Sequence, residues 1–279
     1  MSSLLHNPAV KKLVIQALEE DIGSGDLTTD IIIKSDQKLT AKINSRSRCI
    51  VAGIDVLKLV FKILDPEIKC EIFVNDGNIV EKGQNIAFIS GSAKAILTGE
   101  RTALNFIQRM SAIATLTKLH QETIKPYKAK ISDTRKTTPN FRIFEKYSVK
   151  VGGGSPHRFG LYDAVMIKDN HIQAAGSITE AVLLAKRNIS HTTKIEVETE
   201  NIDQVKEALK VGADIIMLDN MSINDMKGAV KLINGDAITE ASGNVTLETV
   251  NSIASTGVDY ISTSAITAQA GIIDIGLDI

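Results

Sequence analysis

Short apolar segments recur along the second part of the chain, and this recurrence limits the possible folds more than any other feature. From Ala129 onward, an apolar run occurs roughly every 20 to 35 residues, and a helical pattern follows each run. This alternation is typical of parallel β-α units. Helix boundaries agree, because Ser177 and Glu180 have capping-box spacing and Gly212 and Gly257 follow helical stripes. The predicted strands are residues 129–133, 164–168, 194–198, 214–219, 237–242 and 260–263.

The repeated units also indicate the type of sheet. No glycine fingerprint follows the first predicted strand, which disfavours a doubly wound sheet. A closed or nearly closed α/β barrel fits the pattern better. Parallel strands end at one rim, so polar residues at the strand ends are expected to converge on a site. Five predicted strands end in such residues, namely Asp133, Lys168, Glu198, Asp219 and Ser242.

The first part of the chain has a different spacing of apolar residues. Apolar and polar residues alternate over residues 39–44 and 68–74, which predicts strands with one solvent-facing side. The same alternation over residues 273–279 predicts a last strand that returns to this sheet. The predicted fold class is therefore α/β, with an N-terminal α+β sandwich domain and a C-terminal α/β barrel. The predicted domains are residues 1–112, joined by the strand 271–279, and residues 113–270.

Composition excludes several classes of protein. With 279 residues, 43% of them apolar, the chain can bury a substantial core. Its 32 basic and 33 acidic residues give a net charge of −1, so no global field attracts nucleic acid or anionic lipid. Cys49 and Cys70 lack metal-ligand spacing, and we expect both to be reduced packing residues. The start of the chain lacks the apolar core of a signal peptide and no apolar run approaches the roughly 20 residues of a membrane span, so we expect a cytoplasmic protein.

Residues 75–91 resemble part of a different class of protein, the carrier domains. Gly77 and Gly83 stand between short apolar runs, as in the turns of lipoyl- or biotinyl-carrier domains. A carrier needs an exposed lysine at the tip of a hairpin, and neither the flanking residues nor the rest of the chain supports one. Glycine turns between ordinary strands are the better interpretation.

Basic residues gather in one segment of this otherwise neutral chain. They lie in loop sequences beside predicted strand ends, which favours a pocket for a polyanion over a solvated basic face. Arginine can bind a planar carboxylate with two parallel hydrogen bonds, and lysine supplies a compact charge for phosphate. Against only Glu145 and Asp163, the segment holds Arg135, Lys136, Arg142, Lys146, Lys150, Arg158 and Lys168.

Two further features suggest phosphate and metal chemistry. Ser242, Gly243 and Asn244 precede a helical pattern, so their backbone amides would lie at a helix N-terminus, which favours phosphate. Glu198 and Asp219 end neighbouring strands and could hold a water-coordinated magnesium ion or bind ribose hydroxyls; ordinary structural hydrogen bonding is the alternative.

Several long motifs resemble quinolinate phosphoribosyltransferases. In chain order they are EDIGSGDLTTD, GERTALNFIQRMSAIAT, DTRKTTPNFRIFEKYSVKVGGGSPHRFGLYDAVMIKDNHI, IEVE, IMLDN and EASGN. The resemblance spans nearly the whole chain, and its central block is far more specific than a short motif. It implies a two-domain subunit with a TIM-like barrel of the phosphoribosyltransferase type II kind, in a homodimer or higher homo-oligomer.

The resemblance also implies roles for individual residues. The enzyme would join quinolinate to phosphoribosyl pyrophosphate (PRPP) in NAD biosynthesis, giving nicotinate mononucleotide, pyrophosphate and CO2, with Mg2+ as cofactor. Arg101 would reach the site of the neighbouring subunit. The implied quinolinate-binding residues are Arg101, Thr134, Arg135, His157, Arg158 and Lys168. The implied PRPP-binding residues are Lys136, Glu198, Asp219, Asn220, Ser242, Gly243, Asn244, Thr263 and Ser264, with Glu198 and Asp219 binding the metal directly or through water. The implied catalytic residues are Lys136, Lys168, Glu198 and Asp219.

The chain departs from the family pattern in its presumed phosphate loops. Asn244 stands where the family commonly has a second glycine, and Ser264 and Ala268 stand where a glycine and a later histidine are common. Both polar residues can still present backbone amides. For His171 we expect packing or hydrogen bonding rather than catalysis.

Three alternatives remain open at this point. A relative resembling the ModD-like proteins associated with molybdenum transport would use the same donor on another acceptor. A non-catalytic polyanion-binding regulator would keep the basic pocket without needing both Glu198 and Asp219. A phosphate-binding barrel enzyme such as an isomerase or synthase would not depend on PRPP.

Overall fold

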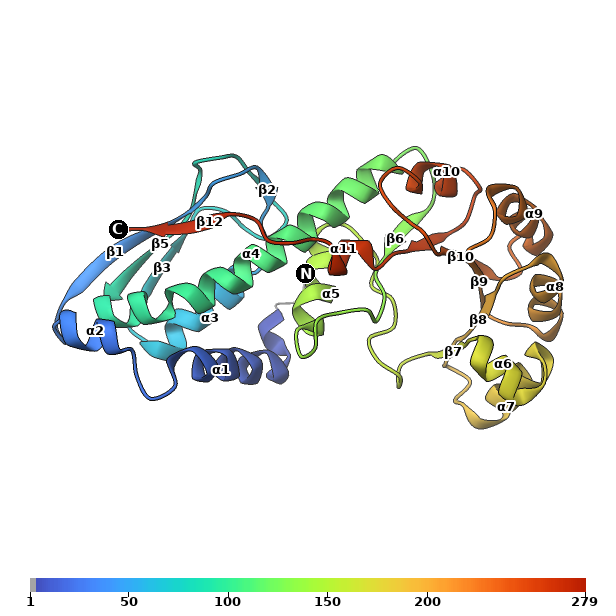
Figure 1. Cartoon of the computed structure of the whole chain (residues 1–279), viewed down its shortest axis with the longest axis horizontal. Coiled ribbons are helices and arrows are strands. Elements are labelled where there is room, and N and C mark those ends of the chain that lie inside the picture. Colours follow the sequence, from blue (N-terminus) through green and yellow to red (C-terminus); the bar gives the residue numbers. More distant parts are fainter. Residues whose placement is uncertain (1–3) are drawn as a thin grey trace. The chain divides into compact units, whose positions relative to one another are not determined.

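The computed structural model describes residues 4–279 and divides into two compact units (Figure 1). The first unit consists of Met1–Lys118, Thr138–Gly153 and Gln269–Ile279, and the second consists of Leu119–Thr137 and Gly154–Ala268. The domain boundary that the sequence predicts near residue 112 falls inside one continuous helix, α4 (Ala93–Thr123).

The first unit is built on a four-stranded antiparallel sheet. Its strand order is β12-β1-β5-β3, with β1 at Lys38–Ser45, β3 at Lys69–Ile72, β5 at Asn85–Ser92 and β12 at Ile275–Asp278. The alternating tail of the chain forms β12, in which Leu277 pairs with Ile43 of β1. A short pair adds β2 (Cys49–Ile50) and β4 (Ile79–Val80), and the helices are η1 (Leu4–His6), α1 (Pro8–Ile22), α2 (Leu27–Ile32), α3 (Ile54–Leu64), α4 and α5 (Arg142–Val151).

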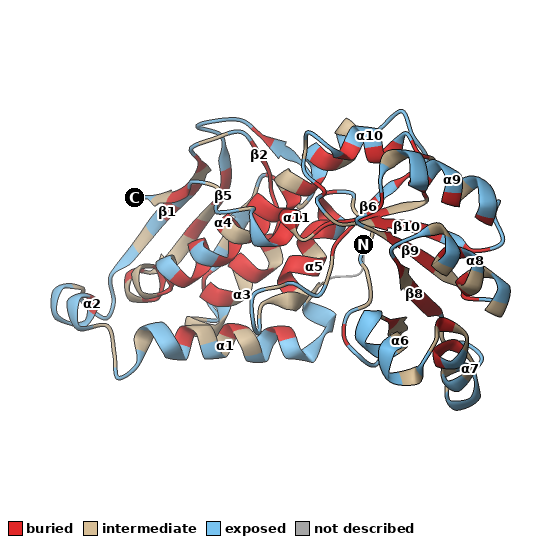
Figure 2. Ribbon diagram, turned by 45° about the vertical axis from the view of Figure 1, so that its right-hand side comes forward, coloured by how far each residue is buried: buried red, intermediate tan, exposed pale blue. Residues whose placement is uncertain are grey.

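Apolar periodicity explains the core of this unit. Val10, Val14 and Leu18 recur at helical spacing in α1 and are buried. Buried residues of α3 and α4 join the same core (Figure 2). The N-terminus of α3 is fixed by Asp76, whose two carboxylate oxygens accept hydrogen bonds from Gly53 N and Ile54 N, each at 3.0 Å.

The second unit contains six parallel strands in the order β6-β11-β10-β9-β8-β7. They are β6 (Lys130–Ser132), β7 (Val165–Ile167), β8 (Ile195–Thr199), β9 (Ile215–Asp219), β10 (Ile238–Ser242) and β11 (Tyr260–Ser262). All six predicted strands are thus confirmed. The intervening helices are α6 (Asp169–Ala175), α7 (Ile178–Asn188), α8 (Ile202–Val211), α9 (Ile223–Ile233), α10 (Val250–Ala254) and α11 (Ala265–Ala268).

The α/β prediction is confirmed, but the sheet is barrel-like rather than closed. Within residues 4–279, β6 and β7 form its two edges and do not pair with each other. A single bridge between Ser132 and Ser155 extends the β6 edge toward the loop before β7. The expected helix caps also form, since Ser177 Oγ accepts a hydrogen bond from Glu180 N and Gly212 ends α8 in the left-handed region.

The two cysteines are free thiols, and Cys49 is buried. Burial raises the pKa of each thiol, which makes both poor nucleophiles. No helix within residues 4–279 has the length and hydropathy of a membrane span.

Gly152 tests the packing of α5 against α4. A Cβ atom there would lie 2.4 Å from the carbonyl oxygen of Ala114, which is backbone and cannot turn away. We expect Gly152→Ala to cost about 1–3 kcal/mol and to lower the Tm by several degrees in calorimetry. Gly228→Ala is the matched control, because its nearest neighbour is 3.8 Å away inside α9 and alanine favours a helix. Equal melting temperatures for both variants would contradict the packing account.

Candidate active site

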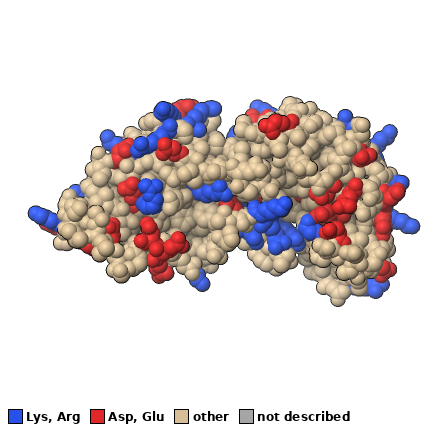
Figure 3. All heavy atoms as spheres, viewed as in Figure 1, with Lys and Arg blue, Asp and Glu red and all other residues tan. Residues whose placement is uncertain are grey.

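The carboxyl ends of the six parallel strands carry nearly all the residues that the sequence singles out. Ser242 pairs in register with Asp219, and Ser262 with Ser132, so these strand ends lie along one edge of the sheet. On the face shown in Figure 3, Asp and Glu side chains gather over β8 and β9, with a group of Lys and Arg beside them. Cations and carboxylates thus share this edge.

Lys168 and Glu198 form an ion pair across two neighbouring strands. Lys168 Nζ donates to Glu198 Oε2, and only 14% of the Glu198 side chain is exposed. Lys168 is also the N-cap of α6, where its backbone N donates to His171 Nδ1 at 2.9 Å. The hydrogen-bonding role expected for His171 is therefore confirmed, and it fixes the position of Lys168.

Asp219 ends a short chain of amide hydrogen bonds. Asn244 Nδ2 donates to Asn220 Oδ1 at 3.1 Å, and Asn220 Nδ2 donates to Asp219 Oδ2 at 2.8 Å. Asn220 and Asn244 both adopt positive φ, of 53° and 50°, which asparagine tolerates better than most residues. Position 243, next to Asn244, accepts only glycine, because a Cβ atom there would lie 2.2 Å from Asn220 Oδ1.

The loop after β6 is held by its own backbone and by α11. Lys136 N donates to Thr134 Oγ1 at 3.0 Å, and Lys136 O accepts from Thr267 Oγ1 at the same distance. These bonds leave the side chains of Arg135 and Lys136 exposed. A ligand in solvent can therefore reach both side chains.

The loop after β11 is more enclosed than the sequence suggested. Thr263 is buried, and its Oγ1 donates to Val245 O at 3.2 Å. Ser264 starts α11, where its carbonyl oxygen accepts from Ala268 N at 2.7 Å. Thr263 thus supports the loop, whereas Ser264 stays partly exposed.

Arg158 lies close to another cation. Burial lowers the pKa of its guanidinium, and the positive charge of Arg135 lowers that pKa further. The Arg158 Nη1 atom donates to Ala164 O at 3.0 Å, which holds the side chain near the start of β7. Two neighbouring guanidinium groups repel each other, and an anion bound between them would relieve that repulsion.

His157 faces two buried carboxylates that the sequence analysis overlooked. Its Nε2 atom lies 3.2 Å from Glu196 Oε2 and 3.4 Å from Glu240 Oε1. Glu196 and Glu240 are 2% and 4% exposed. Of the described residues, these three form the one group whose ligand atoms, all within 4.8 Å of one another, could hold a metal ion. The available signal was alternation, since Glu196 and Glu240 precede Glu198 and Ser242 by two positions and share their face of the sheet.

The protonation of this cluster follows from its hydrogen bonds. Burial lowers the pKa of the His157 ring, but hydrogen bonds to Glu196 and Glu240 outweigh burial and raise that pKa to about 10. Burial also raises the pKa of Glu196. A fully protonated ring would place an Nδ1 hydrogen against Arg158 N, which donates to Nδ1 at 2.7 Å. The hydrogen bond from Arg158 N therefore fits a ring whose proton is on Nε2, facing Glu196 and Glu240.

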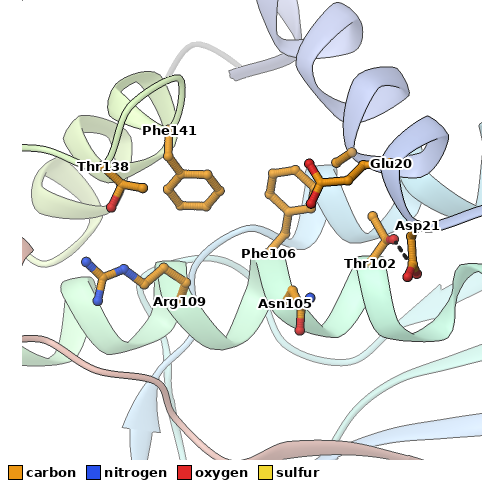
Figure 4. Close-up of a pocket in the computed structure, with 9 residues that line it drawn as sticks. Glu20, Asp21, Thr102, Asn105, Phe106, Arg109, Thr138 and Phe141 are labelled. Carbon is orange, nitrogen blue, oxygen red and sulfur yellow. Dashed lines mark hydrogen bonds between the residues drawn. The ribbon is translucent and has the colours of Figure 1, made fainter.

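Arg101 belongs to the other compact unit. It lies on α4 with its side chain exposed. The next residue, Thr102, lines a pocket of about 410 Å³ between α1, α4 and the start of α5 (Figure 4). The rings of Phe106 and Phe141 stack there at 5.5 Å, and Thr102 Oγ1 donates to Asp21 Oδ2. None of the predicted site residues lines this pocket.

Comparisons with known families and relatives agree along the whole chain. The model of the quinolinate phosphoribosyl transferase N-terminal domain matches residues 26–111, and that of the C-terminal domain matches residues 113–278. The probable carboxylating nicotinate-nucleotide pyrophosphorylase of Bacillus subtilis is 44% identical over 97% of this chain and 93% of its own length. Its counterpart in Synechocystis is 43% identical over 95% and 90%.

Solved structures give the same result. NadC from Streptococcus pyogenes superposes with a TM-score of 0.94 at 38% identity, covering 97% of this chain and 95% of that chain. The nicotinate-nucleotide pyrophosphorylase from Francisella tularensis gives 0.93 at 41% identity, covering 97% and 96%.

The exposed cations of the β6 loop lead to a binding prediction. We expect inorganic pyrophosphate to raise the Tm of the protein. At a concentration one hundred times the Kd, binding should add about 2.7 kcal/mol to the free energy of unfolding. The double variant Arg135→Ala and Lys136→Ala should lose most of this effect. The control removes two exposed lysines of α9, Lys227 and Lys231, and should keep it. An unchanged response in the first variant would argue against an anion site at this loop.

Proposed function

The chain belongs to the quinolinate phosphoribosyltransferase family, and from this premise we propose that it transfers the phosphoribosyl group of PRPP to quinolinate and releases pyrophosphate and CO2. It is a decarboxylating phosphoribosyltransferase, and nicotinate mononucleotide is its product in NAD biosynthesis. The observation that carries the assignment of the site is the division of charge along the strand ends. Cations follow both edge strands, with Arg135 and Lys136 after β6 and Lys168 after β7, and carboxylates and amides follow the strands between them.

Quinolinate would bind at the cationic end. Its two carboxylates would lie against Arg135, Arg158 and Lys168, with Thr134 and His157 alongside. The proximity of Arg135 and Arg158 supports this placement, because a dicarboxylate would offset the repulsion between their two positive charges.

PRPP would bind across the middle strands. Its phosphates would meet Lys136, Ser264 and the backbone amides of Ser242, Gly243 and Asn244. The left-handed turn at Gly243 and Asn244 would let the backbone approach a phosphate closely, because position 243 has no side chain. Thr263 would support this loop, and Asn220 would hold Asp219.

Magnesium fits the carboxylates that end β8 and β9. Mg2+ prefers hard oxygen ligands and usually keeps several waters. Asp219 uses one oxygen, Oδ2, for its bond with Asn220, and Glu198 uses Oε2 for Lys168, so each retains a second carboxylate oxygen for the ion or its waters. When bound, the ion would neutralise charge on the pyrophosphate.

The reaction places different demands on the two ends of the site. The bond between the ribose C1 and the pyrophosphate oxygen breaks, and its electron pair leaves with pyrophosphate, whose charge Lys136 stabilises. Glu198 or Asp219 would stabilise the positive ribose ring until the quinolinate nitrogen attacks C1. The ribosylated ring is cationic, so it accepts the electron pair of the adjacent carbon–carboxylate bond as CO2 departs. A proton from solvent or from Lys168 then completes the product.

Two wider expectations remain parts of this proposal. A homodimer or higher homo-oligomer would let Arg101 complete the site of the neighbouring subunit, consistent with the exposure of that side chain. A cytoplasmic location, expected from the sequence, is proposed as well.

The substrate assignment can be tested by turnover. Purified protein with Mg2+, PRPP and quinolinate should form nicotinate mononucleotide and CO2, and nicotinate in place of quinolinate should not react. Arg135→Ala should raise the KM for quinolinate about tenfold or more, because a charged bidentate contact is lost, and should change the KM for PRPP far less. Equal losses for both substrates would speak against the cationic end as the quinolinate site. Donor binding without product would favour an acceptor other than quinolinate, as in a ModD-like enzyme.

We expect Asn244 to contribute to the binding of PRPP. Asn244→Gly keeps the left-handed backbone but removes the bond to Asn220, so we expect a KM for PRPP about fivefold higher and an unchanged KM for quinolinate. Asn234→Gly is the matched control, since Asn234 has a φ of 44° at the end of α9. If Asn244→Gly behaved like the control in steady-state kinetics, the amide chain would have no role in donor binding.

A mixing experiment tests the role of Arg101. Arg101→Ala and Lys136→Ala subunits should each be nearly inactive alone. If Arg101 acts across the interface, a mixed dimer contains one intact site, and equal mixing should restore up to about a quarter of wild-type activity. Absence of any recovery, with subunit exchange verified by mass, would place Arg101 outside the neighbouring site.

A further inference from the structure

We propose that Glu196 and Glu240 are positioning residues for the acceptor end of the site, which they control by holding the imidazole of His157. This inference rests on the proposed function, because it assigns His157 and Arg158 to the binding of quinolinate. It adds two residues that lie below the strand ends and that would not touch either substrate.

Glu196 and Glu240 lie beneath the strand ends that form the site. They lie on β8 and β10 and project from the same face of the sheet as Glu198 and Ser242, two positions further from the strand ends. Both are almost fully buried. They therefore underlie the rim rather than forming part of it.

Burial of these two carboxylates is unfavourable unless something compensates for it. Within residues 4–279, Glu196 Oε1 has no hydrogen-bond partner, and the only side chain that approaches Glu240 Oε1 is His157, whose Nε2 atom lies 3.4 Å away. Burial of a carboxylate without compensation costs several kcal/mol, so these groups are poor choices for the core of a sheet. The group that both carboxylates approach is His157 Nε2, at 3.2 and 3.4 Å. A role in holding the His157 ring would explain why two carboxylates are buried here despite the free-energy cost.

Hydrogen bonds connect the His157 ring to the backbone of Arg158, which we assign to the acceptor. Arg158 N donates to His157 Nδ1 at 2.7 Å, and His157 N donates to Asp133 Oδ1 at 2.7 Å. With Nε2 facing the carboxylates and Nδ1 accepting from Arg158 N, the ring has one orientation that satisfies both nitrogens. That orientation fixes the backbone from which the Arg158 guanidinium extends. Loss of either carboxylate would let the ring turn and would loosen Arg158.

The test compares full-length variants in steady-state kinetics. Glu196→Gln and Glu240→Gln keep the size of the side chain but remove an acceptor charge. We expect each to raise the KM for quinolinate about tenfold while the KM for PRPP changes less than about twofold. Glu240→Asp, which keeps the charge, should recover part of the loss.

A matched control separates positioning from stability. Asp259 is a partly buried carboxylate of the same unit that accepts hydrogen bonds from Thr239 N and Thr239 Oγ1, at the amino ends of β10 and β11. Asp259→Asn should lower the Tm without separating the two KM values. A similar separation in this control, or equal changes in both KM values for the Glu196 and Glu240 variants, would overturn the proposal.

A second readout does not depend on turnover. The chain has five histidines, so the His157 ring can be identified in long-range nitrogen NMR by its absence in His157→Asn. The wild-type ring should show an unprotonated Nδ1, and Glu240→Gln should alter that signal. An unaltered signal would overturn the proposal, as would a stoichiometric divalent ion in the purified protein that Glu240→Gln removes. If the wild-type protein made no product from quinolinate, the proposed function would be refuted. The NMR signal of His157 would still show whether Glu240 holds the imidazole ring.

Discussion

Parallel pairing of six strands is the constraint on which the site depends. Because all six strands point the same way, their carboxyl ends share one edge, and residues separated by more than 100 positions become neighbours there. Ser132 at the end of β6 and Ser262 at the end of β11 illustrate this, since they pair in register. Helices between the strands supply the caps that end each loop, as Lys168 and His171 do at α6.

Charge along this edge is organised in two levels. The level nearer the solvent carries the exposed Arg135 and Lys136 and the partly buried Lys168, Glu198 and Asp219, and its cations suit substrates with many negative charges. The buried level carries His157 between Glu196 and Glu240. In our proposal the first level binds the substrates, and the second holds the groups that bind the acceptor in their orientation.

The sequence predicted the strands and the rim because both follow from local pattern. Apolar runs and caps located all six strands, and their last residues identified Lys168, Glu198 and Asp219. Glu196 and Glu240 were missed because a glutamate inside an apolar run gives no local sign of its partner, which lies on a loop some 40 to 80 residues away. The bond between Asn244 and Asn220 was invisible for the same reason, since it joins two loops through side chains. Closure of the sheet could not be predicted either, because it depends on the pairing of edge strands rather than on any single strand.

The most direct test of the account is a crystal structure of the protein with quinolinate bound. The account predicts that the two carboxylates lie against Arg135 and Arg158, with the ring above the His157 cluster and the middle strand ends free for PRPP. Quinolinate bound at the Gly243 turn instead, with Arg135 and Arg158 still facing each other without an anion, would contradict the assignment of the two ends of the site.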